Sequence, residues 1–87
     1  MKYKKVVLQA YYGLDDGYIP FPENPMHGKE FYNVNVEFSE TVQIISGIEF
    51  VWDVIEIEGE EPIECELVGT TRLSDGTLII KICEDWG

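Results

Sequence analysis

The sequence predicts a single all-β domain, residues 1–87, folded as a small antiparallel barrel or sandwich of five to six strands. Apolar and polar residues alternate along most of the chain, which is the period of a half-buried strand. β-Branched and aromatic residues dominate the apolar stretches, and short Gly-, Asp- and Pro-containing turns separate them. With 87 residues, 45% apolar and 13% aromatic, the chain suffices for one packed core.

The first half of the chain contains two clear strand patterns. In residues 3–12 the predicted inward face is Val6, Leu8, Ala10 and Tyr12. In residues 31–38 the predicted inward face is Tyr32, Val34, Val36 and Phe38, with Asn33, Asn35 and Glu37 outward. Residues 41–45 continue as a strand up to a turn at Ser46–Gly47, and one short helix around 39–46 is compatible with the same class.

The segment 48–58 fits both a helical stripe and a strand face. Its β-branched and aromatic composition favours a strand, and a helix would set Glu49 and Asp53 in repulsion four residues apart. A bulge near Val54–Ile55 would return Ile55 to the core side. Residues 59–62 then form a turn, 63–73 alternate again, and 74–76 connect a hairpin into 77–83. We expect 48–58 to pair with 63–70, with carboxylates opposite one another.

The two cysteines and the N-terminus predict a cytoplasmic protein with reduced thiols. The alternation places Cys65 inward and Cys83 outward, so a disulfide between them is disfavoured. No apolar run approaches the ~20 residues of a membrane span. The basic start is followed by an apolar stretch that Gln9 interrupts, and no small-x-small cleavage site follows.

The charge is large and unevenly placed. The net charge is −11, and residues 30–71 hold eleven Asp or Glu side chains and no Lys or Arg. Such a surface is repelled by nucleic acid and by anionic membranes, so direct binding to either is disfavoured. The predicted partner is a basic protein, such as a nucleic-acid-binding enzyme or complex.

Most of these acids fall on the predicted outward faces and the turn between 48–58 and 63–70. The predicted acidic face comprises Glu49, Asp53, Glu56, Glu58, Glu60, Glu61, Glu64 and Glu66. One interpretation is that this face binds the partner, because ordinary strand faces mix charges of both signs. The other interpretation is that it serves only solubility, and the sequence leaves both open.

The long connection 13–30 is the second candidate site. It holds three prolines, three glycines and the only histidine, without a periodic pattern. Tyr18, Phe21, Met26 and His27 are its candidate residues. Tyr18, Phe21 and Met26 either cap an open end of the barrel or belong to a stiff binding loop, and His27 is expected at the solvated surface. Asp15, Asp16, Glu23 and Asn24 carry oxygens that could bind calcium, but they lack the spacing of a calcium loop, so no metal is predicted.

No catalytic motif is present, and we predict neither enzymatic activity nor a cofactor. The chain has no nucleophile elbow, no phosphate-binding GxxxxGK loop and no histidine pair. The leading hypothesis is a small acidic inhibitor that occupies the basic groove of a nucleic-acid-binding protein, as DNA-mimic, anti-defence and immunity or antitoxin proteins do. The alternative is an accessory interaction module that binds through loop 13–30. The oligomeric state stays open.

Overall fold

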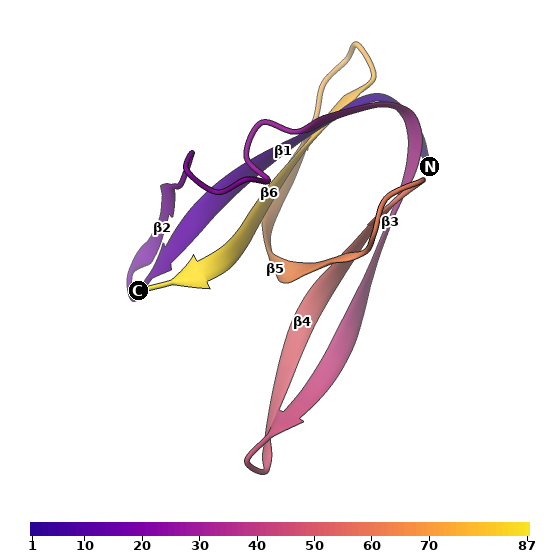
Figure 1. Cartoon of the computed structure of the whole chain (residues 1–87). Helices are drawn as coiled ribbons and strands as arrows, with labels where there is room; N and C mark the ends of the chain where they lie inside the picture. Colours follow the sequence, from indigo (N-terminus) through magenta and orange to yellow (C-terminus); the bar gives the residue numbers. More distant parts are fainter.

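The computed structural model describes all 87 residues and contains six strands and no helix. The strands are β1 (Lys2–Leu14), β2 (Gly17–Pro20), β3 (Glu30–Ile45), β4 (Ile48–Ile57), β5 (Ile63–Arg72) and β6 (Thr77–Trp86). Their order is β2-β1-β3-β4-β5-β6, and an additional β1–β6 pairing closes β1, β3, β4, β5 and β6 into a barrel (Figure 1). The predicted all-β class is confirmed, and the fold is a barrel with one extra strand. Residues 39–45 belong to β3, so no short helix forms there.

The barrel is closed by a parallel pair of the first and last long strands. β1 and β6 run side by side from the Lys5/Thr77 pair to the Gly13/Trp86 pair. All other neighbouring strands are antiparallel, as predicted. Alternation does not encode strand direction, so the sequence pattern could not reveal this parallel pair.

The core fills this barrel with side chains from all five closed strands. Its eleven buried members are Tyr3, Val6, Leu8, Val36, Ile55, Ile57, Ile63, Cys65, Leu78, Ile80 and Ile82. The predicted inward positions Val6, Leu8 and Ala10 are buried. In a chain this small, each aliphatic side chain removed from water contributes roughly 1.5–3 kcal/mol, so a single closed core accounts for most of the driving force.

The inward face predicted for residues 31–38 is only partly correct. Val36 is buried, but Tyr32 and Phe38 are exposed. Asn33 adopts a left-handed conformation with φ of 53°, and this breaks the alternation. As a result the Tyr3/Val34 pair and the Val6/Phe31 pair both contact the core, while Tyr32 lies between them on the outside.

The predicted pairing of 48–58 with 63–70 is mostly wrong. β4 pairs with β3 over its whole length, from Val36/Ile57 to Ile45/Ile48, in one unbroken register. The expected bulge near Val54–Ile55 is therefore absent. β4 pairs with β5 only from Asp53/Cys65 to Ile55/Ile63, after which β5 crosses to β6.

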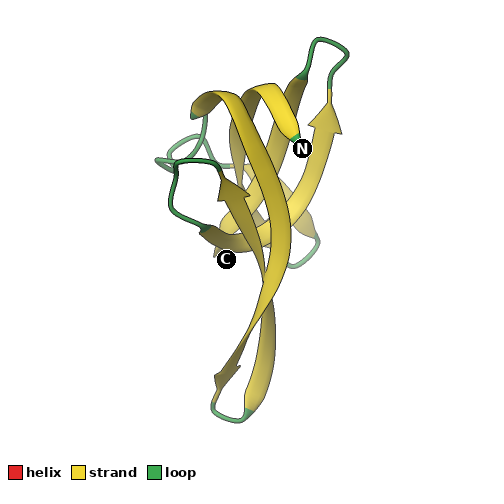
Figure 2. Cartoon of the chain, turned by 90° about the vertical axis from the view of Figure 1, so that its right-hand side faces the viewer, coloured by secondary structure: helices red, strands yellow, loops and turns green.

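The far part of the β3–β4 hairpin projects from the barrel as a two-stranded ribbon. We call residues 39–54 the arm. The molecule is accordingly elongated, with extents of 43 × 24 × 21 Å, and the arm twists strongly as it leaves the barrel (Figure 2). Strong twist is typical of ribbons that have only two strands.

Both cysteines are free and buried, which corrects the predicted exposure of Cys83. β6 carries a bulge at this point, because Tyr11 pairs with Cys83 and Tyr12 with Asp85, leaving Glu84 as the extra residue. Cys83 is not part of the core cluster. Its Sγ donates to the Asp85 carbonyl oxygen at 3.2 Å and is fully covered.

We predict that neither thiol reacts with Ellman's reagent in the folded protein. Burial raises the pKa of the Cys65 thiol to about 12 and also raises that of Cys83, so little thiolate exists at pH 8. Both thiols should react at once in guanidinium chloride, which serves as the control. Rapid labelling of Cys83 in the native protein would contradict its burial at the bulge of β6.

Candidate functional site

Exposed carboxylates gather where the arm joins the barrel. We call this surface the acidic rim. Its members are Glu37 of β3, Glu56 of β4, Glu58, Glu60 and Glu61 after β4, Glu64 of β5 and Glu84 of β6. They line two hollows that share Glu60 and Pro62. The rim therefore draws on four strands and on the turn that follows β4.

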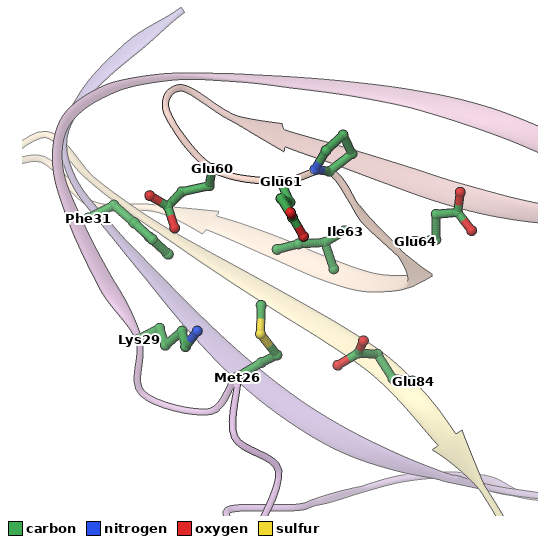
Figure 3. A pocket seen from close by; sticks show the side chains of 9 residues that line it. Met26, Lys29, Phe31, Glu60, Glu61, Ile63, Glu64 and Glu84 are labelled. Atoms are coloured by element: carbon green, nitrogen blue, oxygen red, sulfur yellow. The ribbon is translucent and has the colours of Figure 1, made fainter.

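The larger hollow, about 400 Å³, has an apolar floor and acidic sides. Met26, Phe31 and Ile63 line it together with Glu60, Glu61, Glu64 and Glu84, and Lys29 is the only cation (Figure 3). The view shows Lys29 and the carboxylates of Glu60 and Glu61 reaching in from opposite sides. Lys29 forms no ion pair with these carboxylates; the single ion pair of the structure is Lys5–Glu30 at 3.3 Å. An alkyl chain that ends in a cation matches such a lining.

The second hollow, about 290 Å³, is held in shape by Glu58. The Glu58 Oε1 accepts from the backbone N–H of Asn35 at 2.9 Å and from its side-chain amide at 3.1 Å. These bonds hold the pKa of the Glu58 carboxyl below its usual value. Glu58 thus fixes the rim, whereas Glu37 and Glu56 beside it stand free.

Like charges do face each other across a ladder, but between β3 and β4. Glu37 lies directly opposite Glu56, and Glu40 directly opposite Asp53. The sequence prediction placed this repulsion between β4 and β5. Directly opposed carboxylates destabilise a sheet. The β3–β4 hairpin nevertheless keeps one unbroken register through both pairs.

The structure divides the eight predicted acidic residues among different surroundings. Glu56, Glu58, Glu60, Glu61 and Glu64 come together in the rim. Glu49 lies near the tip of the arm, opposite Ile44.

Asp53 and Glu66 do not stand outward as predicted. The Asp53 Oδ2 accepts from the backbone N–H of Leu67 at 2.7 Å, at the point where β5 leaves β4. One Glu66 carboxylate oxygen is buried without a hydrogen-bond partner. The proximity of Glu66 raises the pKa of Tyr18.

Two rim members were not among the predicted residues. The alternation in 31–38 already placed Glu37 outward, and that signal was available. Glu84 comes from the far end of the chain and reaches the rim only through barrel closure, so no local pattern could have identified it.

The connection 13–30 contains more regular structure than predicted. Leu14 ends β1, Gly17–Pro20 forms β2, and the two strands make a hairpin through Asp15–Asp16. Tyr18 is partly exposed and packs edge-to-face on Trp86, with ring centroids 5.9 Å apart. Phe21 packs similarly on Tyr12 at 5.7 Å.

Residues 21–29 supply the hydrogen bonds that β1 lacks in its middle. β3 pairs with β1 up to Val7 and β2 pairs from Tyr11, which leaves residues 8–10 without a strand partner on that edge. The backbones of Phe21, Gly28 and Lys29 bond to this stretch. His27 completes the edge, because its Nδ1 accepts from the Ala10 N–H at 3.0 Å.

Asn24 holds this loop in place, a role that the sequence pattern did not indicate. Its side chain is buried, its Oδ1 accepts from the Met26 N–H at 2.8 Å, and its Nδ2 faces the carboxylates of Glu84 and Asp85 at 3.3 and 3.2 Å. Met26, packed against the core, is carried into the larger hollow by this arrangement.

Comparison of the chain with models of protein families, with curated proteins and with solved structures gave no match. No three His, Cys, Asp or Glu side chains are grouped so that they could hold a metal ion. With six strands as its only regular elements, the fold offers no helix able to cross a membrane.

Replacing His27 by Ala should destabilise the fold by about 1–3 kcal/mol, because the Ala10 N–H would lose its acceptor in a partly buried place. Urea denaturation measures the loss. His27→Asn is the matched control, since its Oδ1 can take the place of Nδ1 and should restore most of the stability. Equal losses in both variants would assign the effect to ring packing.

Replacing Glu56 by Gln should stabilise the protein by a few tenths of a kcal/mol, because it relieves the repulsion from Glu37 across the ladder. The gain should shrink at 1 M salt, where the charges are screened. Glu61→Gln, in the turn, removes the same charge without an opposed partner and should leave the denaturation midpoint nearly unchanged. A gain of equal size in Glu61→Gln would point to general charge reduction.

Proposed function

We propose that this protein is a non-enzymatic binding protein whose acidic rim occupies a basic surface of a partner protein. The observation that carries the proposal is the rim itself: seven exposed carboxylates around two adjoining hollows, none of them in an ion pair. Their neighbours offer a single lysine, Lys29. Free carboxylates at this density steer and hold a positively charged partner.

The larger hollow supports a specific mode of contact. Its floor of Met26, Phe31 and Ile63 suits the aliphatic stem of a Lys or Arg side chain, and the carboxylates around it suit the charged head. A basic side chain of the partner would thus be bound through both of its parts. The neighbouring hollow, where Asn35 fixes Glu58, could take a second basic side chain of the partner.

The partner that best fits this chemistry is a nucleic-acid-binding enzyme or complex, whose groove concentrates Lys and Arg side chains. Occupying that groove would inhibit the partner without any reaction. In this proposal the protein acts in the cytoplasm as an inhibitor of the DNA-mimic, anti-defence or immunity type. The rim is less dense in charge than duplex DNA, which carries one charge per ~1.7 Å of its axis, but the barrel holds it rigidly.

The alternative function, an accessory module that binds through loop 13–30, has less support. His27 and Asn24 are engaged in bonds within the chain, and Met26 packs on the core. Of the predicted loop residues only Tyr18 offers an exposed aromatic face, next to Trp86. These contacts favour a structural role for the loop.

The test is a variant that neutralises four of the seven rim carboxylates, all without a side-chain hydrogen bond: Glu37→Gln, Glu56→Gln, Glu61→Gln and Glu64→Gln together. Glu58 is left intact because it accepts from the backbone of Asn35. Asp53 and Glu66, which lie outside the rim, are also unchanged, because Asp53 accepts from the Leu67 N–H and one Glu66 oxygen is buried. We expect at least a tenfold weaker affinity for the natural partner, a slower on-rate and a flatter dependence on salt. Surface plasmon resonance at several salt concentrations measures all three.

The matched control neutralises four acids away from the rim: Asp15, Asp16, Glu23 and Asp75, each to Asn or Gln. It removes the same net charge, so it separates the rim from the overall charge of the molecule. Unchanged affinity of the rim variant, or an equal loss in the control, would overturn the proposed function.

A further inference from the structure

The arm exposes a set of large apolar side chains that the barrel does not use. They are Val42, Ile44, Ile45, Ile48, Phe50 and Val51, with exposed fractions that range from 40% at Phe50 to 70% at Ile44. All six lie within the ten residues that surround the Ser46–Gly47 turn. Exposed apolar clusters of this kind mark interaction sites in soluble proteins.

These side chains lie on both faces of the ribbon. Directly opposed residues share a face, so Val42 with Val51 and Ile44 with Glu49 form one face. Gln43 with Phe50 and Ile45 with Ile48 form the other. An arm that lay flat on a surface would leave one of these faces in water, so insertion into a cleft is the geometry that covers both.

Both edges of the arm are also open, except at its base, where Asp53 and Val54 pair with β5. β1 pairs with β3 only through residues 30–35, and β5 pairs with β4 only through residues 53–55. A two-stranded ribbon without further partners is marginally stable in water, and open edges are a liability in a free protein. The same features favour insertion between the walls of another molecule.

The charge of the arm and the rim indicates what kind of molecule would receive the arm. The arm carries Glu40, Glu49 and Asp53 and no cation, and the acidic rim surrounds its base. A third hollow, lined by Gln43, Trp52, Glu64, Cys65 and Glu84, connects the arm to the rim. A second copy of the chain would bring another net charge of −11 to this region, so a basic partner is favoured over self-association.

We propose that the arm inserts into an apolar cleft of the partner protein, a cleft edged by Lys and Arg side chains that contact the acidic rim. This inference rests on the proposed function and adds the shape and chemistry of the partner's site: an apolar slot with a basic border. The arm supplies the buried centre of the interface, and the rim supplies its charged border.

The first experiment asks what the arm contacts. The photo-crosslinking residue p-benzoylphenylalanine is placed at Val51 in the arm, or at Leu73 as a control in the turn after β5, at the other end of the molecule (Figure 1). Both positions are exposed and apolar. Irradiation of the source cells should yield an adduct from Val51 with one protein whose surface bears a basic-edged cleft, and none from Leu73.

The second experiment uses that protein, purified, as the probe. The arm variant carries Val42→Thr, Ile44→Thr and Val51→Thr, which removes apolar surface from one face while it keeps β-branched side chains. The matched control carries Leu14→Thr, Ile19→Thr and Leu73→Thr, which are exposed apolar residues outside the arm. We expect at least tenfold weaker binding with an unchanged salt dependence for the arm variant, and less than a twofold change for the control. Ile44→Thr alone serves if the triple variant does not fold.

The outcomes separate this inference from the proposed function. If the arm variant binds normally while the rim variant loses affinity, the arm inference is overturned and the function stands. If the arm variant weakens binding while the rim variant keeps its affinity and salt dependence, the acidic function fails, and the choice of a basic partner fails with it.

Self-association provides a check that needs no partner. Sedimentation of the purified chain should show a monomer up to about 100 μM, a concentration well above the micromolar range of a specific contact. A dimer that the arm variant abolishes, an adduct from Val51 with a second copy, or no adduct from Val51 at all would each overturn the inference.

Discussion

The parallel pairing of β1 with β6 is the constraint on which the rest of the structure depends. Only when the first and last long strands meet do Val6 and Leu8 from one end of the chain pack with Ile80 and Ile82 from the other. β5 is the hairpin partner of β6, so β5 has to leave β4 after three residue pairs to follow it. Asp53 stabilises this departure by accepting from the Leu67 N–H. Beyond that point β3 and β4 have only each other, and the arm is the result.

The same constraint assembles the acidic rim. Barrel closure brings Glu84 to Glu60, Glu61 and Glu64, while the β3–β4 register sets Glu37 opposite Glu56. The strand topology therefore decides where the rim lies. Its carboxylates repel one another, and this repulsion lowers the stability of the fold. A surface that costs stability and has Lys29 as its only neighbouring cation fits the proposed basic partner, which would supply the missing counter-charges. The apolar arm leads to the same conclusion, because it too is incomplete in the isolated chain.

The two surfaces have different physical roles. Charges act at a distance and accelerate encounter, whereas apolar surface contributes only once water has left the interface. In the proposed complex, the rim would orient the partner first, and the arm would be buried against it afterwards. Loop 21–29 helps to form the larger hollow. Its hydrogen bonds to the middle of β1 keep Met26 and Lys29 at the lining of this hollow.

Local patterns in the sequence were sufficient for the all-β class, the positions of most strands, the inward positions Val6, Leu8 and Ala10 of β1, and the concentration of acids between residues 30 and 71. These are local properties, since alternation, β-branched composition and charge density are read over a few residues. Pairing partners are not local. The sequence therefore missed that β4 pairs chiefly with β3 and that Cys83, next to the bulge in β6, is buried. Asp53 and Glu66 turn inward where β5 passes from β4 to β6, which only the tertiary structure decides. The large apolar side chains of Ile44 and Phe50 stay exposed because the barrel closes without them.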